Sequence, residues 1–309
     1  MNVNGIDLGN LDAQFKPANE GKVLLLDGDF LIYQAAATVK TLPTAVRRFY
    51  TLVMTEMFLT GCTECRVYLT PTGNKKCDRY YYPATLKYQD NRVKRQELPL
   101  KGPLKQHIID NPAEYADKNI HAVFDDWHEA DDLLIQDSYQ LKGDSILSSG
   151  DKDLRLTPYP WWDAKTGTCE ATLDTPYGYI YFDPDEAAPL KGRGTAFFWA
   201  QMLMGDSADN VKGITKLDGK NCGPSMAYKF LKDFKTEAEA AHEVVSAYAR
   251  NGQDVLAEAQ MMWLRRNSDD DAYTYLKEVI TDESLLAWID SLNEYHKQYI
   301  AYAKEQHNG

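Results

Sequence analysis

Carboxylate side chains gather in four short stretches of this 309-residue chain, and their type and spacing suit metal chemistry. The densest stretch is Glu129–Ala130–Asp131–Asp132, which places three carboxylates directly before an apolar run. Like charges this close raise one another's pKa. A helix N-terminus offers only about 0.3–1 kcal/mol to each of them. A hard divalent cation would compensate them, because Mg²⁺ binds carboxylates together with substrate phosphates. The alternative interpretation is an acidic first turn of a solvated helix.

Three further stretches place acids where a strand is predicted to end or a helix to stop. Asp27 closes the apolar run 22–26, which reads as a buried parallel strand. Open α/β sheets bind ligands at such strand ends. We expect Asp29 to cap the following helix, which leaves Asp27 favoured as functional. All-oxygen ligation favours Mg²⁺ or Mn²⁺ over zinc. The predicted ligands, which are also the predicted catalytic residues, are Asp27, Glu129, Asp131, Asp132, Asp151, Asp153, Asp206 and Asp209.

The elements that must position these acids follow from apolar periodicity. The order is strand, helix, strand, basic insertion, strand, helix, strand, which indicates an α/β fold with a mainly parallel sheet. Hairpin-like strands are expected over 158–183 and a helix over 195–204. The predicted strands are 22–27, 65–70, 120–124 and 145–149, and the predicted helices before residue 158 are 44–60 and 129 to about 142.

The insertion at residues 71–119 is strongly basic although the whole chain has a net charge of −12. Between residues 75 and 105, nine basic residues accompany three acids, and four tyrosines are interleaved. Basic side chains contact phosphates and aromatic faces stack on unpaired bases. A solvated basic loop is the alternative. The predicted contacts to nucleic acid are Arg79, Tyr82, Lys87, Tyr88, Arg92, Lys94 and Arg95, joined by Gly213, Gly223 and Ser225 in a helix–glycine hairpin–helix layout.

Composition restricts the other possibilities. The five scattered cysteines indicate a reducing compartment rather than a disulfide framework. Cys62, Cys65 and Cys77 could supply three zinc ligands, but buried thiols are the favoured interpretation. The sequence contains no apolar stretch of membrane-spanning length and no signal-peptide core, and it has no phosphate-binding GxxxxGK[ST] loop. Carboxylates beside a basic, aromatic insertion therefore favour two-ion hydrolysis of a phosphodiester.

Four motifs occur in register with those of a known family. They are Leu26–Asp27–Gly28–Asp29, Glu129–Ala130–Asp131–Asp132, Ser149–Gly150–Asp151–Lys152–Asp153, and the run from Gly205 to Gly213 that reads GDSADNVKG. Over roughly residues 22–232 the chain resembles the 5′-nuclease superfamily, and it is most similar to the free-standing phage 5′→3′ exonucleases. The resemblance implies a PIN-like nuclease core over 22–205 after an N-terminal arm (1–21). It also implies a helix-hairpin-helix element over 206–232. The apolar periodicity of the remainder predicts a helical C-terminal region over 233–309 that packs on the core.

The resemblance further implies two metal sites, one from Asp27, Glu129, Asp131 and Asp132, the other from Asp151, Asp153, Asp206 and Asp209. It implies K⁺ at the hairpin and an arch over a single-stranded 5′ end. Three departures stand out. No acid follows the second strand at Leu69–Thr70–Pro71. Gln89 stands where the family often has an arch lysine, which leaves Lys87, Lys94 or Arg79 as substitutes. The hairpin is longer, and Ser225 replaces a common lysine.

These features favour a Mg²⁺-dependent 5′→3′ exonuclease or flap endonuclease, with Mn²⁺ as a possible substitute. It would cut DNA at a 5′ end or 5′ flap and leave 5′-phosphate products. By resemblance, we expect a monomeric phage protein that acts in DNA replication in the host cytoplasm, with no membrane partner. Two alternatives remain open. One is a catalytically weakened DNA-binding module, and the other is an RNA-directed, RNase H-like 5′ nuclease of the same fold.

Overall fold

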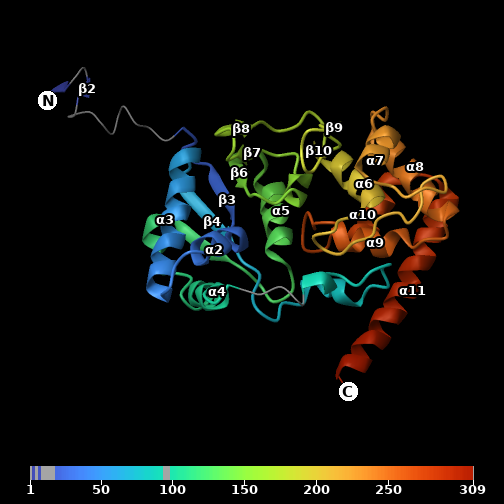
Figure 1. Ribbon diagram of the computed structural model, residues 1–309, viewed down its shortest axis with the longest axis horizontal. Coiled ribbons are helices and arrows are strands. Elements are labelled where there is room, and N and C mark those ends of the chain that lie inside the picture. Colours follow the sequence, from blue (N-terminus) through green and yellow to red (C-terminus); the bar gives the residue numbers. More distant parts are fainter. Residues whose placement is uncertain (1, 4–5, 8–17, 93–97, 309) are drawn as a thin grey trace.

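A six-stranded sheet forms the centre of the molecule in the computed structural model, which describes residues 2–3, 6–7, 18–92 and 98–308 (Figure 1). Its strand order is β5-β4-β3-β6-β7-β8; β3 to β7 run parallel, and only the edge strand β8 is antiparallel. The strands are β3 (Val23–Asp27), β4 (Glu64–Tyr68), β5 (Ile120–Val123), β6 (Ser145–Ser148), β7 (Trp161–Asp163) and β8 (Thr168–Glu170). The predicted mainly parallel α/β sheet is confirmed.

Strand β3 lies inside the sheet between β4 and β6, and all five of its residues are buried. Leu24 and Leu26 face a core shared with α2 (Gly28–Ala36), α3 (Leu42–Thr60) and α4 (Lys101–Asp110). Val23 and Leu25 face the other core, which contains α5 (Ala130–Leu141) and the C-terminal helices. Alternation of side chains along a strand explains this division, and Figure 1 shows the two groups of helices on opposite sides of the sheet.

The order of the strands creates a switch point beside β3. The chain passes from β3 to β4 and β5 on one side, and β6 then pairs with β3 on the other side. Crevices at such points, beyond the carboxyl ends of the strands, are where open α/β sheets bind ligands. Strand β4 ends at Tyr68, two residues before the predicted end, and Thr70 there contacts other elements instead.

The second half of the chain surrounds the helix α6 (Thr195–Met204), which is buried along nearly its whole length. The predicted hairpins at the sheet edge are only partly right. Strands β7 and β8 pair there, but β9 (Tyr179–Phe182) pairs with β10 (Leu190–Arg193) in a separate sheet. Aromatic packing of Phe182 on Tyr228 joins β9 to a helix instead. The remaining helices are α7 (Pro224–Leu231), α8 (Glu237–Arg250), α9 (Val255–Met262), α10 (Ala272–Val279) and α11 (Glu283–Asn308).

Short helical pieces make up the basic insertion, as its prolines and glycines predict. They are the 3₁₀ turns η2 (Lys76–Tyr81) and η3 (Asp90–Arg92), the helix α4, and η4 (Ala116–Lys118). Two further 3₁₀ turns, η5 (Lys142–Asp144) and η6 (Asp153–Leu156), flank β6. In Figure 1 the insertion extends along the lower side of the molecule, from the segment beside α11, where η2 packs, to α4, which packs on α2 and α3.

Most of the predicted N-terminal arm lies outside the described residues, although β1 (Asn2–Val3) and β2 (Ile6–Asp7) pair as a short hairpin. A search of the helices in the described ranges finds none with the length and apolar character needed to span a membrane.

Candidate metal centre and nucleic-acid interface

Asp27 ends the central strand at the switch point. Its Oδ1 accepts a hydrogen bond from the Phe30 backbone N–H at 3.0 Å, so Asp27 is the cap of α2. The expectation that Asp29 is this cap is wrong, because the helix begins one residue after the strand and not three. Oδ2 of Asp27 accepts from the Ser149 hydroxyl at 2.7 Å. Burial, together with the charges of Asp29 and Asp151, raises the pKa of Asp27 to about 6.

Asp29 instead supplies a carboxylate beside the end of β4. Its Oδ2 accepts from the Thr70 backbone N–H at 3.2 Å, and its Oδ1 pairs with Lys105 Nζ at 2.6 Å. The hydroxyl of Thr70 in turn accepts from the Ala130 N–H at the start of α5, at 2.9 Å. The acid that is missing after the second strand in the sequence is thus brought there from α2. Asp29 is not among the ligands predicted from the sequence.

Asp132 lies at the start of α5 but is turned away from the other acids. It is fully buried, and both of its oxygens accept from the Arg79 guanidinium at 2.7 Å. The backbone N–H groups of Glu129 and Arg265 also donate to it, at 3.2 and 3.1 Å. Burial alone would raise the pKa of Asp132, but Arg79 holds it below its usual range. Asp132 thus lies outside the pocket acids, with its oxygens occupied by donors, and its predicted role as a metal ligand stays a prediction.

Arg79 and Tyr88 are equally part of the interior. Arg79 is 3% exposed and also pairs with Glu129 Oε2 at 3.0 Å, and its remaining N–H groups donate to backbone carbonyls of α9 and the residue after it. Tyr88 is 6% exposed and donates its hydroxyl to Glu129 at 2.8 Å. Both side chains hold the start of α5, and their predicted contacts to nucleic acid stay predictions that this burial disfavours.

The carboxylate of Asp131, at the same helix start, has no hydrogen-bond donor. Within the described part of the chain, its side chain forms no hydrogen bond and no ion pair. Burial and the neighbouring carboxylates of Asp151 and Asp27 raise its pKa well above the ordinary value. An unpaired acid held among like charges is an arrangement that a divalent cation would relieve.

Asp153, Asp206 and Asp209 form the tightest acidic group that the described residues contain. One oxygen from each carboxylate lies within 4.8 Å of the other two. Asp153 follows β6 and lies in η6, whereas Asp206 and Asp209 lie in the loop after α6, which an Asp206–Val211 bridge closes. Burial and the charge of Asp151 raise the pKa of Asp153 to about 7. The three oxygens suit one Mg²⁺ or Mn²⁺.

A pocket of about 820 Å³ joins these groups. Asp151 is exposed at its wall and accepts from the Asp153 N–H at 2.9 Å, which places it beside that group. Seven carboxylates line the pocket, and five basic side chains face them. The acids are Asp27, Asp29, Glu129, Asp131, Asp151, Asp153 and Asp209, and the bases are Lys76, Arg92, Lys101, Lys105 and Lys152. Six of the eight predicted ligands line the pocket itself. Asp206 is a seventh, because it belongs to the acidic group with Asp153 and Asp209.

Lys76 enters this pocket from the insertion and was missed by sequence reasoning. Its ammonium lies 2.9 Å from Glu129 Oε1 and donates to the Gln89 side chain. The backbone at Lys76, Cys77 and Asp78 adopts φ of 50°, 53° and 63°. Such left-handed conformations cost side-chain-bearing residues about 1–3 kcal/mol each. No local sequence signal marks this run, because it contains neither glycine nor asparagine.

Contacts from the segment before α5 hold the left-handed run in place. The buried Asn74 amide donates to the carbonyls of Asp125 and His128, both at 2.8 Å, and its oxygen accepts from the Lys76 N–H at 2.7 Å. The Cys77 N–H donates to the Trp127 carbonyl at 2.8 Å. Lys76 is therefore aimed at the carboxylates by a strained and well-anchored turn.

The other predicted contacts to nucleic acid divide by exposure. Lys87, Arg92 and Ser225 are exposed, and Gly223 has open space around it; Arg92 also pairs with Asp209. Tyr82 is half-buried against His296. Lys94 and Arg95 lie outside the described residues. Three exposed aromatic side chains at the pocket were not predicted: Phe30, Tyr33 and Tyr80.

Gly213 does not present its backbone at the surface. It is buried with φ +65°, its N–H donates to Glu258 at 3.2 Å, and its carbonyl accepts from Gln253 at 2.8 Å. An added Cβ would meet the Gly205 backbone N at 2.4 Å. This glycine serves the packing of two chain segments, and its predicted close approach to DNA stays a prediction that this burial disfavours.

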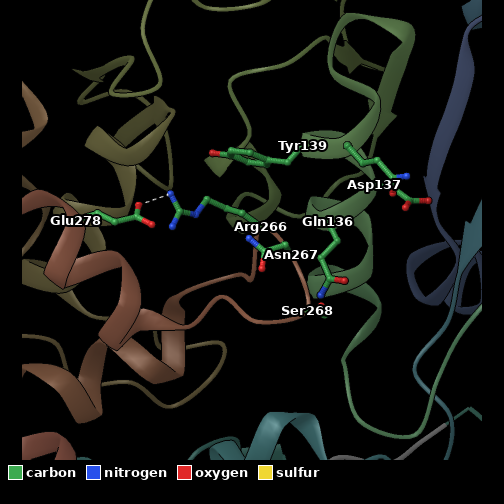
Figure 2. Close-up of a pocket in the computed structure, with 8 residues that line it drawn as sticks. Gln136, Asp137, Tyr139, Arg266, Asn267, Ser268 and Glu278 are labelled. Carbon is green, nitrogen blue, oxygen red and sulfur yellow. Dashed lines mark ion pairs between the residues drawn. The ribbon is translucent and has the colours of Figure 1, made fainter.

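A second hollow, of about 620 Å³, lies further along α5 (Figure 2). Gln136 and Tyr139 of α5 face Arg266, which pairs with Glu278 at 2.9 Å. Asp137 is likewise paired, with Arg66 at 2.8 Å. Both acids of this second hollow, Asp137 and Glu278, are thus paired with arginines. The first pocket is therefore the candidate metal centre. The three cysteines considered for zinc are buried, Cys62 and Cys65 in the α2–α4 core and Cys77 beside Asp132 at 3.7 Å.

Comparison with solved structures agrees with the fold of this chain. The sequence matches no protein-family profile and no curated protein. Among solved structures, the T5 5′-exonuclease with bound zinc superposes with a TM-score of 0.51 over 90% of this chain and 99% of that chain, at 16% identity. The chain has the fold of a phage 5′-exonuclease. The PIN-like α/β fold that the resemblance implied is therefore confirmed. The bacteriophage T5 flap endonuclease, solved in a pseudo-enzyme–product complex with DNA and metal ions, is 15% identical with a TM-score of 0.48, and 91% of this chain and 99% of that chain are covered.

Proposed function

We propose that this protein is a metal-dependent 5′ nuclease that hydrolyses DNA phosphodiesters at a 5′ end or 5′ flap. The observation that carries the proposal is the convergence of carboxylates from β3, α5, the β6–η6 segment and the loop after α6 in one pocket at the switch point. Structural ion pairs do not require an excess of acids in a crevice, whereas two divalent cations do.

Asp153, Asp206 and Asp209, whose oxygens already lie together, would hold one ion. For a second ion we infer Asp27, Asp131 and Asp151, which line the same pocket with Glu129 beside them. Burial and the charge of Asp151 raise the pKa of both Asp27 and Asp131 there. When bound, a pair of Mg²⁺ ions supplies a hydroxide at neutral pH and stabilises the charge of the in-line transition state. K⁺ at the loop before α7 remains part of the proposal.

The protein's own cations position the phosphate. Lys76 and Lys105 line the pocket beside the acids, each paired with one carboxylate, so that both ammonium groups are held at the site before a substrate binds. Lys76, which donates to the Gln89 side chain, supplies the positive charge that an arch lysine at position 89 would have supplied. Prepositioned cations of this kind act on the charge that develops in the transition state and need no reorganisation.

Exposed aromatic side chains favour a substrate with unpaired bases. Phe30, Tyr33 and Tyr80 are 42%, 56% and 48% exposed and lie at the same pocket. Stacking on an aromatic ring is worth about 1–3 kcal/mol per base and requires an unpaired base. A single-stranded 5′ end that reaches the carboxylates past these rings is the substrate that this arrangement fits.

Two substitutions test the proposal. Asp131→Asn and Asp153→Asn each remove the charge of one ligand from a different metal site. Both variants should lose cleavage of a 5′-flap DNA duplex in Mg²⁺ but keep or tighten its binding, because they remove negative charge near the phosphates. Asp163→Asn, in the β7–β8 hairpin, is the matched control and should cleave normally.

The product ladder from a 5′-labelled flap separates the activities. Mononucleotides indicate exonuclease action, and a single longer fragment indicates flap cutting. Near-normal cleavage by both Asn variants at limiting Mg²⁺ would refute the site assignment. Binding without cleavage in the wild type, with or without EDTA, would establish the DNA-binding module instead. Preferential cleavage of an RNA 5′ strand on DNA would establish the RNA-directed nuclease.

A further inference from the structure

The carboxylates of the pocket differ in whether they carry a cation of the protein's own. Asp153 and Asp206 share Lys152, whose Nζ lies 2.8 Å from Asp153 Oδ1 and 2.6 Å from Asp206 Oδ2. Asp209 pairs with Arg92. In the described part of the chain, by contrast, no lysine or arginine pairs with Asp27, Asp131 or Asp151. The two proposed ion sites are therefore unlike each other in charge.

Lys152 stands where the ion of the Asp153–Asp206–Asp209 group would bind. Those three carboxylates bring oxygens within 4.8 Å of one another, and the ammonium contacts two of them. Mg²⁺ requires its oxygens at about 2.0–2.1 Å. An ion and the ammonium would thus compete for the same two carboxylates at close range, where like charges repel.

The lysine can leave without disturbing the fold. Its side chain is 42% exposed and lines the pocket, and it follows Asp151 in the short link between β6 and η6. Its departure would break two ion pairs but no backbone hydrogen bond of the sheet. Asp206 would keep the Ala208 N–H at 2.8 Å, and Asp153 would keep the Gln201 amide.

We propose that Lys152 is an internal counter-cation that occupies the second ion site until a divalent cation displaces it. The Asp27–Asp131–Asp151 site then fills first, and the Asp153–Asp206–Asp209 site fills later and more weakly. Displacement sets the ammonium free inside the pocket, where it can meet a substrate phosphate. This inference rests on the proposed function only in taking the pocket as a binding site for divalent cations.

Mn²⁺ titration without nucleic acid, followed by electron paramagnetic resonance of the free ion and by calorimetry, tests the inference. The wild type should bind one ion tightly and a second ion weakly. Lys152→Met keeps the length of the side chain but removes its charge, and it should tighten the second site at least fivefold, the lower end of ordinary coupling between sites. Lys152→Arg keeps the charge and should resemble the wild type. Lys165→Met, in the exposed β7–β8 turn, is the matched control.

A second-site affinity in Lys152→Met that tightens less than fivefold, or weakens, overturns the inference. A second measurement observes Lys152 itself, so that the inference can be tested even if Lys152→Met does not fold. Reductive ¹³C-methylation labels the lysines, and Lys152→Arg identifies the Lys152 signal. This signal should move in the second phase of a Mg²⁺ titration; movement in the first phase, or none, also overturns the inference. Two-phase ion binding without any DNA cleavage would refute the proposed function but would still support the role of Lys152.

Discussion

Removal of the Arg79 guanidinium should lower the free energy of unfolding strongly. It should not weaken the binding of DNA, because the buried guanidinium does not face the solvent. Arg79→Met keeps the aliphatic stem but removes hydrogen bonds to Asp132, Glu129 and two backbone carbonyls. It leaves Asp132, which is fully buried, without its cation. Breaking a buried ion pair from one side costs about 3–5 kcal/mol, mostly because the partner charge stays buried.

Urea unfolding in EDTA, followed by tryptophan fluorescence and circular dichroism, measures this loss. Arg92→Met is the matched control, since Arg92 also pairs with an aspartate but has a 43% exposed side chain. An exposed ion pair contributes about 0–1 kcal/mol, so the midpoint for Arg92→Met should stay near that of the wild type. The two arginines lie in the same basic insertion and both pair with an aspartate, but Arg79 is buried and has more hydrogen-bond partners.

The opposite result would refute the structural role of Arg79. If Arg79→Met unfolds within 1 kcal/mol of the wild type and loses affinity for a catalytically inert flap substrate, then Arg79 reaches phosphates, as its place in the basic insertion first predicted. Folding near that of the wild type with unchanged affinity would contradict both roles. The affinity should be measured at two salt concentrations, because a lost phosphate contact reduces the salt dependence.

Three further outcomes follow from the site. Burial raises the pKa of Asp27 to about 6 and that of Asp153 to about 7, so between about pH 4 and 7 these two carboxyls bind more protons in the folded protein than in the unfolded chain. The metal-free protein should therefore lose stability as pH rises from about 4 to 7, and Mg²⁺ should abolish that slope in urea midpoints, since it binds the deprotonated acids; a rising stability in EDTA would contradict this. Lys76→Met should slow single-turnover cleavage about 100-fold, while the midpoint of thermal unfolding stays close to that of the wild type; unchanged cleavage would exclude a role in phosphate positioning. Gly213→Ala should lower stability by more than about 1 kcal/mol because φ is +65° and the Cβ meets Gly205, whereas Gly223→Ala, in open space, should unfold normally.

Features that depend on nearby residues were predictable from the sequence. The apolar run before Asp27 specifies a strand buried on both faces, and the strand ends then bring acids together because parallel strands share one edge. Asp27, Asp131, Asp151 and Asp153 reach the pocket in this way. The fold class followed from the same alternation of strands and helices.

Features that depend on distant partners were not predictable. A count of basic residues places Arg79 in a nucleic-acid surface, but its partners Asp132 and Trp263 lie 53 and 184 positions away in the chain. Asp132 looked like its neighbour Asp131 because both follow Glu129, yet their side chains lie on different sides of the helix start. The direction of Lys76 depends on a left-handed turn that its own residue types disfavour. Each of these is decided by packing that local patterns do not contain.

The last helix has a consequence for when the site becomes competent. Lys304 of α11 pairs with Asp78 in the left-handed turn and lies over the rings of Tyr81 and Trp127, 5.7 and 6.0 Å from their centroids. His296 of the same helix packs against Tyr82 and pairs with Asp254 at 2.6 Å. The turn that aims Lys76 is thus held from two sides, by the segment just before α5 and by a residue more than 200 positions later in the chain. We expect loss of the α11 contact to loosen this turn, so that the position of Lys76 at the carboxylates depends on whether the last helix has packed.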